Sequence, residues 1–596
     1  MRLPVAVRPP SLPTLTGCLP FQQLLITAVV PLLLFGLATS AVLAAPPSPS
    51  AGLGGTGIES WPRERPLLPD FRPNTQPAIG LPPLKPLPKA PLSSQAHLRV
   101  ERIELTGNTV FSGPELLAIT AAYEGRKISA EELQSLRQQL TLYYVKRGYV
   151  NSGAVIPDQE VKDGVVVIRI VEGRLTGIEI TGNERLREAY IRPRLEQGLD
   201  GPLNINALGR NVMGLHDGPV IRRIKARLKP GAHPGEAVLF AEVEEKNPWQ
   251  LNFQFANDRS PSVGSAQLET TLAHHDLTGW GDTLDLRTDL TEGLSDFETS
   301  YTLPLNANDS TVRLWFSKSD SYVVEAPFEA LDIASETKTY GLTLNYPFGK
   351  NDGRGWSLGA TLEHRYGETF LLGVPFSFSP GSDDGTVAST AFRLSQDFLL
   401  RQSSRVVAFR QLFSFGLDPF GSSVSDSGPD ENFLSWLAQA QWAERLGDKG
   451  LQFISRADMQ LAKEPLLYLE RFAVGGATTV RGYRENLFVR DNGVIASMEL
   501  RLPLGRVPLY QVSREVNDGI VQLAPFVDWG RSWNSGDPIS KPEEISSLGL
   551  GLRWDPSPAL HLQVYLAHPL NNADLDREEH DLQDSGIHFS LSWQAI

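Results

Sequence analysis

The chain has 596 residues and carries a formal net charge of −14 at pH 7. A chain of this length is expected to form several domains, and an acidic balance without any basic run argues against nonspecific nucleic-acid binding. Cys18 is the only cysteine, which excludes an intramolecular disulfide and a thiolate zinc cluster.

The N-terminus has the pattern of a targeting segment. Residues 24–43 are almost entirely apolar, follow Arg2 and Arg8, and lead into Val42-Leu43-Ala44-Ala45. This pattern predicts a signal peptide, residues 1–44, cleaved after Ala44; a single membrane anchor is the alternative, because the run is near spanning length. No later segment approaches 18 apolar residues, so any later membrane domain must be a β-barrel.

Residues 45–96 are rich in Pro, Gly and Ser, a composition typical of an extended linker. Within them, residues 52–57 formally match the dinucleotide-binding pattern G-x-G-x-x-G. Such a site needs a preceding strand and a following helix, and a Pro-rich linker supplies neither. We therefore expect no nucleotide site there.

Two copies of one pattern lie 75 residues apart. Ile-Glu-Leu-Thr-Gly-Asn at residues 103–108 returns as Ile-Glu-Ile-Thr-Gly-Asn at residues 178–183. Each copy predicts a short strand that ends at a Gly-Asn turn. In the first copy, Ser112 and Ser129 each stand three residues before an acid, which predicts two helix starts, and two strands follow up to Gly173.

The order β-α-α-β-β, found twice, resembles tandem POTRA domains at residues 97–173 and 174–246. The second copy matches less well, because residues 201–218 are rich in Gly and Asn and obscure its second helix. POTRA modules bind extended or partly folded chains, in part by lending a sheet edge. The resemblance therefore implies client binding, and a role as spacers is the alternative.

In residues 249–596 the pattern changes to short segments of alternating apolar and polar residues, without a convincing helix. This region holds ten of the eleven tryptophans. We count sixteen candidate strands, which predicts a 16-stranded antiparallel transmembrane β-barrel. In residues 283–290, leucines alternate with Asp285, Arg287 and Asp289. The apolar face should contact lipid, and the charged face should line a wet lumen.

The spacing of the strands predicts which connections are extracellular. If the first strand rises from the periplasm, the connections after odd-numbered strands are extracellular and long: 320–336, 366–385, 463–491, 531–545 and 569–584. Connections after even-numbered strands are short, except 503–519. The last strand, 587–593, resembles the C-terminal signal that barrel-assembly machinery reads when it inserts a barrel into outer-membrane lipid.

The connection 463–491 contains Val480-Arg481-Gly482-Tyr483. An arginine stays protonated, so away from bulk water it needs an anionic or hydrogen-bonding partner. A matching carboxylate occurs downstream in Phe526-Val527-Asp528-Trp529-Gly530, and strand alternation places Phe526, Asp528 and Gly530 on the lumen face.

These two motifs together resemble the VRGY loop and the F-x-D-x-G strand motif of outer-membrane two-partner secretion transporters, the hemolysin-activator type. The resemblance covers residues 97–596 and implies that the loop folds into the lumen, where Arg481 pairs with Asp528. An exposed loop with a solvated arginine is the alternative. Many relatives carry an N-terminal plug helix, for which residues 45–96 offer no amphipathic candidate.

The resemblance implies a transporter, located in the outer membrane with its POTRA domains in the periplasm. It would export a hemolysin- or adhesin-like client protein, unfolded, and we expect it to act as a monomer. An outer-membrane protein assembly factor of the same superfamily is the alternative, although two repeats favour secretion. A passive porin is a third interpretation, but a porin needs neither the repeats nor the VRGY loop.

We expect no enzymatic activity, cofactor or metal. Residues 355–359 match the G-x-S-x-G pattern of hydrolases, but the alternation continues through residues 360–365 as a strand. A nucleophile elbow would need a sharp turn and a helix at that point. The sequence also contains no P-loop and no metal-ligand cluster.

Overall fold

The computed structural model describes residue 71 and residues 97–596, with gaps at 352, 379–383, 418–428, 430, 448, 517, 537–542 and 574–579. The predicted signal peptide and all of the predicted linker except Phe71 lie outside the described residues. Among the described helices, none is both long enough and apolar enough to cross a membrane.

The first repeat folds around two helices. Its elements are β1 (His97–Val100), β2 (Arg102–Thr106), α2 (Gly113–Thr120), β3 (Arg126–Ser129), α3 (Ala130–Val145), β4 (Gly153–Val155) and β5 (Val165–Val171). Strand β5 lies in the middle of a three-stranded sheet, parallel to β2 and antiparallel to β4. Strands β1 and β3, which sequence reasoning missed, form a separate antiparallel pair.

Helix α3 begins where the sequence predicted. Ser129 caps it: its hydroxyl oxygen accepts from the backbone N–H of Glu132 at 3.2 Å, and the Glu132 carboxylate accepts from the N–H of Ser129 at 2.8 Å. This reciprocal pair satisfies two donors at the helix start. The buried face of the helix carries Leu133, Leu136, Leu140 and Tyr144 at helical spacing.

The second repeat has the order of strands and helices of the first, without counterparts of β1 and β3. Its elements are β6 (Arg174–Thr181), α4 (Glu188–Glu196), α5 (Ile205–Asp217), β7 (Ile221–Pro230) and β8 (Glu236–Glu245). Strand β8 lies between β6, to which it is parallel, and β7, to which it is antiparallel. The helix that Gly and Asn obscured in the sequence is α5, which the side chain of Asn204 caps.

The Gly-Asn turn has the same physical basis in both copies. Gly107 has φ = 79° and Gly182 has φ = 83°, in the left-handed region that favours glycine. A Cβ atom would lie 2.5 Å from the carbonyl oxygen of Ile170 in the first copy and 2.3 Å from that of Val243 in the second. The repeated glycine is therefore required both by conformation and by close packing of the backbone.

A glutamate secures each turn. In the first copy, Glu172 accepts hydrogen bonds from the backbone N–H groups of Thr109 and Val110 and from the hydroxyl of Tyr144, at 2.8–2.9 Å. In the second copy, Glu245 accepts from the N–H groups of residues 184–186 at 2.9–3.0 Å. These charge-assisted bonds join the end of β5 to the loop after β2, and the end of β8 to the loop after β6.

Residues 249–594 form a closed antiparallel barrel. The two-residue strand β16 (Val374–Pro375) folds back on β15. The other sixteen strands of the described barrel confirm the predicted number; they are β9 (Trp249–Ala256), β10 (Gln267–His275), β11 (Thr283–Leu290), β12 (Leu294–Pro304), β13 (Thr311–Tyr322), β14 (Ala334–Asn351), β15 (Arg354–Leu371), β17 (Thr386–Arg401), β18 (Arg405–Leu417), β19 (Leu434–Leu446), β20 (Leu451–Ala462), β23 (Asn492–Arg506), β24 (Ile520–Trp533), β25 (Glu544–Ser557), β26 (Leu560–Pro569) and β27 (Ile587–Gln594).

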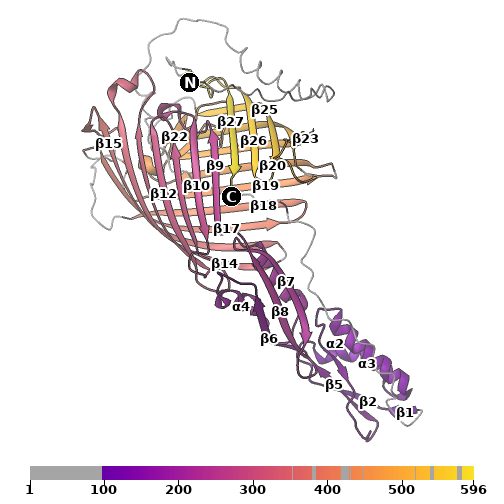
Figure 1. The fold of residues 1–596 in the computed structure, drawn as a ribbon. Coiled ribbons are helices and arrows are strands. Elements are labelled where there is room, and N and C mark those ends of the chain that lie inside the picture. Colours follow the sequence, from indigo (N-terminus) through magenta and orange to yellow (C-terminus); the bar gives the residue numbers. More distant parts are fainter. Residues whose placement is uncertain are drawn as a thin grey trace, which may run out of the picture. The chain divides into compact units, whose positions relative to one another are not determined.

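The first and last strands close the barrel, and Figure 1 shows β9 in magenta beside β27 in yellow. Their antiparallel pairing runs from Ala256 opposite Ser590 to Asn252 opposite Gln594. Closure leaves no free sheet edge in the wall, as a membrane-spanning sheet requires.

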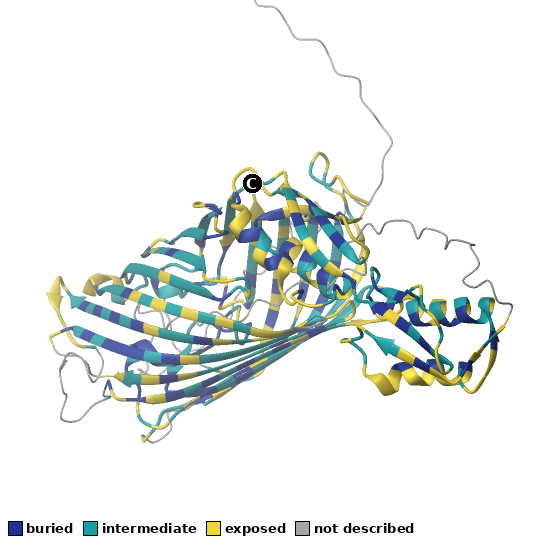
Figure 2. Ribbon diagram, turned by 90° about the horizontal axis from the view of Figure 1, so that it is seen from below, coloured by how far each residue is buried: buried dark blue, intermediate teal, exposed yellow. Residues whose placement is uncertain are grey.

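Burial alternates along the strands, visible as banding of the ribbon in Figure 2. In β24, Val527 is 47% exposed whereas its neighbour Asp528 is 0% exposed. In β23, Met498 is exposed and Glu499 is buried. The predicted facing of these strands is therefore confirmed, with apolar side chains outside and polar ones inside.

The lengths of the connections alternate as predicted along most of the barrel, but the connection after the third strand, residues 291–293, is short. Those after odd-numbered strands include 323–333, 372–385 and the longest, 463–491. Those after even-numbered strands are mostly short, such as 402–404 and 558–559. Residues 507–519 are the expected exception.

Candidate functional site

The candidate site is built around the connection 463–491 between β20 and β23. Strands β21 (Phe472–Val474) and β22 (Phe488–Arg490) pair antiparallel inside this connection. We call residues 466–474 and 488–490 the stem, and residues 475–487 the tip. The tip contains all four loop residues of the motif.

Glycines open the tip. Gly475 and Gly476 have φ values of 117° and 104°, which side-chain-bearing residues rarely adopt. The N–H of Gly476 donates to the carbonyl oxygen of Val480 at 3.1 Å, and the hydroxyl of Thr479 accepts from the N–H of Gly475 at 2.8 Å. The resulting compact turn presents Arg481 to the wall of the barrel.

Arg481 binds Asp528 on β24 through a two-point contact. Its Nε donates to Oδ2 at 2.8 Å and its Nη2 donates to Oδ1 at 2.9 Å. The backbone N–H of Arg481 adds a third bond to Oδ2 at 3.1 Å. Both residues are buried, so the geometry is that of a strong, fork-shaped pair in a site from which water is largely excluded.

A second carboxylate completes the charge balance. Nη1 of Arg481 donates to Oε2 of Glu499 on β23 at 2.7 Å, and Nη2 donates to the hydroxyl of Ser497 at 3.2 Å. Nε of Arg501 donates to the other oxygen of Glu499 at 2.7 Å. Two arginines thus face two carboxylates, the arrangement in which buried charges cost least.

Aromatic rings flank the guanidinium of Arg481. Its central carbon lies 3.5 Å from the ring centre of Phe526 and 4.7 Å from that of Tyr565 on β26. A cation over the face of an aromatic ring is attracted by the ring quadrupole, more strongly when the site is desolvated. Phe526 therefore supports the arginine that its neighbour Asp528 neutralises.

Val480 and Gly530 fit against each other. A Cβ atom on Gly530 would lie 2.8 Å from Cγ2 of Val480 and 2.7 Å from Cγ1 of Val474. Val480 is fully buried in a cluster that also includes Tyr483, Ile495 and Ile545. A glycine in the strand motif lets this apolar part of the loop contact the wall directly.

Gly482 and Tyr483 reach the strands near the barrel closure. Gly482 has φ = 91°, its N–H donates to Nε2 of His588 on β27 at 3.0 Å, and a Cβ there would lie 2.9 Å from Cβ of Ala567. The hydroxyl of Tyr483 donates to the carbonyl oxygen of Ser546 at 2.8 Å. Both residues therefore dock the tip through close packing and main-chain hydrogen bonds.

Arg484 extends the set of contacts to two other connections. Its Nη2 donates to Oδ2 of Asp584 at 2.6 Å, and Nη1 donates to Glu325. The next residue, Glu485, donates its backbone N–H to Oε1 of Gln583 at 2.8 Å. The tip is thus held on several sides.

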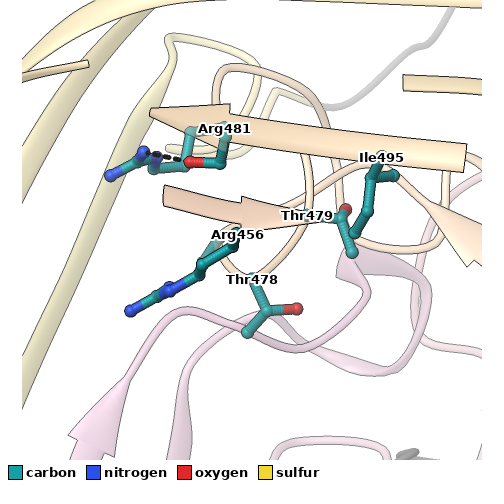
Figure 3. Close-up of a pocket in the computed structure, with 7 residues that line it drawn as sticks. Arg456, Thr478, Thr479, Arg481 and Ile495 are labelled. Atoms are coloured by element: carbon teal, nitrogen blue, oxygen red, sulfur yellow. Dashed lines mark hydrogen bonds between the residues drawn. The ribbon is translucent and has the colours of Figure 1, made fainter. Parts of the chain in front are cut away.

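Little space remains beside Arg481. A cavity of about 10 Å³ lies between the tip and the wall, lined by Arg481, Thr478 and Thr479 of the tip and by Arg456 and Ser497 of the strands, among others (Figure 3). A space of this size holds about one water molecule. The tip therefore packs closely against the wall at this place.

The structure brings together all seven residues that the two motifs supplied: Val480, Arg481, Gly482 and Tyr483 of the tip with Phe526, Asp528 and Gly530 of β24. Sequence reasoning missed the partner roles of Glu499, Tyr565 and His588. Alternation along β23 places Glu499 on the lumen face, and its register position opposite Phe526 was the available signal. Tyr565 and His588 belong to strands that local patterns do not connect to the loop.

Comparison with known families matches two regions. Residues 235–554 match the family model "Haemolysin secretion/activation protein ShlB/FhaC/HecB". Residues 98–173 match the model "POTRA domain, ShlB-type".

Curated relatives match at low identity over most of their length. The outer membrane transporter CdiB of Dickeya dadantii is 23% identical over 504 residues, which cover 81% of this chain and 86% of the relative. The hemolysin transporter protein ShlB of Serratia marcescens is 24% identical over 422 residues, 68% of this chain and 72% of the relative.

Solved structures share the fold. The structure of CdiB from Escherichia coli has a TM-score of 0.65 at 20% identity and covers 86% of this chain and 93% of its own. BamA from Haemophilus ducreyi, lacking POTRA domains 1–3, has a TM-score of 0.50 at 15% identity and covers 83% of this chain and 100% of its own.

Proposed function

Because the chain belongs to the haemolysin secretion/activation protein family ShlB/FhaC/HecB, we propose that it exports one client protein through the barrel and that the tip of loop 463–491 is the gate. The protein is an outer-membrane transporter of two-partner secretion, with its POTRA region in the periplasm. The client would be a secreted hemolysin- or adhesin-like protein, in line with the hemolysin transporter relative.

The observation that carries the gate proposal is the buried contact between Arg481 and the two carboxylates of the wall. A structural role alone would not need this loop, since ladder hydrogen bonds and the lipid-facing side chains hold the barrel together. A charged contact at the inner wall has a further property: a client that supplies competing polar groups and water can displace it. The pair therefore suits a contact that forms and breaks during transport.

The polar lumen suits an unfolded client. On the first strands, Arg287 lies 3.0 Å from Glu269 and 3.0 Å from Asp289. Arg259, in the connection between β9 and β10, lies 2.9 Å from Asp289. Charges of both signs alternate along this wall and pair with one another. Such a surface offers hydrogen bonds to a passing backbone without the large apolar areas that would retain it.

The periplasmic repeats are suited to receive the client as an added strand. Strand β4 lies at one edge of the first three-stranded sheet, and β7 lies at one edge of the second. Strand β7 is the longer of the two and exposes Arg223, Arg227 and Lys229. We propose that an extended client segment pairs with these edges before it enters the barrel.

The remaining parts of the proposal concern energy and assembly. Folding of the client outside the cell would give transport its direction, without nucleotide hydrolysis or any cofactor. The transporter would act as a monomer without enzymatic activity, after insertion by the barrel-assembly machinery. The shared fold with BamA keeps an assembly factor as the second candidate, and the two repeats favour export.

Co-expression in a bacterial host with the secreted protein encoded beside the transporter tests the function. We expect the client in the medium when the transporter is present and in the periplasm when it is absent. A client that stays in the periplasm beside a correctly inserted transporter would refute export. Impaired insertion of unrelated barrels on depletion would identify the assembly factor instead.

A further inference from the structure

A second buried charge cluster holds the stem of the loop to a different part of the wall. Glu470, only 1% exposed, accepts from Nη2 of Arg393 on β17 at 2.8 and 3.1 Å. Strand β17 is separated from β23 by β18, β19 and β20. The loop is therefore fixed at two distant places in the lumen.

Two further charged side chains join Arg393 and Glu470 in the cluster. Arg393 also lies 3.0 Å from Glu363 on β15, and Nε of Arg365 lies 2.8 Å from the same carboxylate. Nη1 of Arg365 donates to the carbonyl oxygen of Leu469 at 2.7 Å. Two arginines and two glutamates thus share a nearly dry site, where removal of one charge leaves the others uncompensated.

Further contacts fix the stem at the same place. Leu467 and Leu469 are buried against Val387 of β17. Nε2 of Gln460 on β20 donates to the carbonyl oxygen of Glu470 at 3.1 Å. The stem therefore has its own apolar and polar attachment, independent of Arg481.

Left-handed residues bound the tip on both sides. Gly475 and Gly476 separate it from β21, and Asn486, with φ = 58°, precedes β22. Residues that tolerate such conformations are suited to absorb large changes of backbone angle. A fully extended tip with both ends held would reach about 20 Å from the stem, at ~3.3 Å per residue.

We propose that Glu470 is a positioning residue of the gate: it fixes the stem to the wall while the tip swings about Gly475–Gly476 and Asn486 when Arg481 leaves its carboxylates. The tip then opens a route without loss of the loop from the lumen, and it returns to the same place afterwards. This inference rests on the proposed gate function.

Cysteine accessibility of the stem tests the proposal without any client. Ala473→Cys on β21 serves as the reporter after Cys18→Ser removes the chain's only cysteine. A membrane-impermeant maleimide is added to intact cells, and labelling is read only in the heat-modifiable, assembled barrel. We compare the reporter alone, with Arg481→Ala, with Glu470→Gln, and with both.

We expect slow labelling in the reporter and in each single variant, because one attachment remains in each. The double variant should label at least about tenfold faster, because both buried contacts are lost. The matched control uses Glu464→Gln in place of Glu470→Gln, because Glu464 lies in the same loop and, among the described residues, pairs with exposed Lys463. Glu464→Gln combined with Arg481→Ala should label slowly. Arg393→Gln removes the same contact from the wall and should act like Glu470→Gln.

Exchanging the charges of Glu470 and Arg393 distinguishes a positioning role of Glu470 from a general loss of structure. Glu470→Arg with Arg393→Glu keeps two charges of each sign in the cluster and should restore slow labelling in the Arg481→Ala background. Fast labelling with Arg481→Ala alone, slow labelling of the double variant, or failure of the exchange to restore protection would each overturn the proposal. Wild-type export by the double variant, together with the expected labelling pattern, would refute only the gate function.

Discussion

Replacing Arg481 with Ala removes the guanidinium that neutralises two buried carboxylates. Asp528 loses two side-chain hydrogen bonds and Glu499 loses one, while Asp528 stays fully buried. Loss of one partner from a buried ion pair costs about 3–5 kcal/mol. The strand ladder and the lipid-facing side chains do not use Arg481, so this cost falls on the docked tip rather than on the barrel.

This loss of free energy increases the fraction of transporters in which the tip is released from the wall. Since about 1.4 kcal/mol is a factor of ten, the balance between docked and released tip should shift by about 10²- to 4 × 10³-fold. In planar bilayers, the Arg481→Ala channel should spend much more time in open states than the wild type. The amount of secreted client per inserted transporter should fall strongly. Without Arg481 the tip no longer returns to one docked position, so the gate that a client normally displaces is not formed.

Two further variants refine the measurement. Arg481→Lys should rescue poorly, because an ammonium group cannot reproduce the two-point contact with Asp528 or the stacking on Phe526. Asp528→Ala should resemble Arg481→Ala, and the double variant should be little worse than either, since both remove one interaction. Arg313→Ala, which removes a wall arginine paired with Glu298, is the matched control and should leave export unchanged.

The reasoning would be refuted by wild-type conductance and export in Arg481→Ala. It would also be refuted if the losses in the two single variants simply added in the double variant. In either case, the two residues would lie in contact without acting as a pair. Heat-modifiability of each variant must equal that of the wild type, so that assembly is not the cause.

Two other predictions concern the periplasmic repeats. Burial raises the pKa of Glu172, but hydrogen bonds from Thr109, Val110 and Tyr144 outweigh this effect and lower the pKa below its usual range. The ionised carboxylate therefore stabilises the first repeat fully above about pH 4.3, and this stabilisation is lost as the pH falls through the lowered pKa. Glu172→Gln should therefore destabilise the first repeat by about 1–3 kcal/mol at pH 7 and by much less in acid, as measured by hydrogen exchange; an effect independent of pH would contradict this assignment. Deletion of residues 97–173 should abolish export but leave a heat-modifiable barrel, and normal export by that variant would reduce the first repeat to a spacer.

The facing of the barrel strands was predictable because side chains alternate with a period of two. Val527 and Trp529 are apolar neighbours of Asp528, and lipid on one side with water on the other gives that alternation a direction. The number of strands followed from the same pattern with the turns between segments. The resemblance to known motifs then indicated that Arg481 meets Asp528.

The contacts across the lumen could not be predicted in this way. Alternation shows that Glu363 and Arg393 face inward, but it does not show that a loop residue such as Glu470 reaches them. That neighbourhood depends on closure of the whole barrel and on the path of the loop. The same limit applies to Arg484 and Asp584, which are 100 residues apart.

Tertiary packing also stabilises helices and strands that the local sequence pattern predicts only weakly. Helix α5 contains Gly and Asn, which favour turns, yet it buries Leu208, Val212 and Leu215 on one face. Strands β1 and β3 have four residues each and are stabilised by their mutual pairing. Neither their length nor their composition distinguishes them from loops.

A disulfide that fixes the tip in the lumen tests most directly whether export requires the tip to move. Val480→Cys and Gly530→Cys suit this purpose in a Val474→Ala background. A Cβ on Gly530 would lie 2.8 Å from Cγ2 of Val480, which the new thiol replaces, and 2.7 Å from Cγ1 of Val474, which the alanine removes. With Cys18→Ser, the two thiols have no competing partner. We predict no export from the oxidised transporter and recovery on reduction, with each single cysteine variant insensitive to oxidation. Equal export before and after reduction of a fully formed disulfide would contradict the gate.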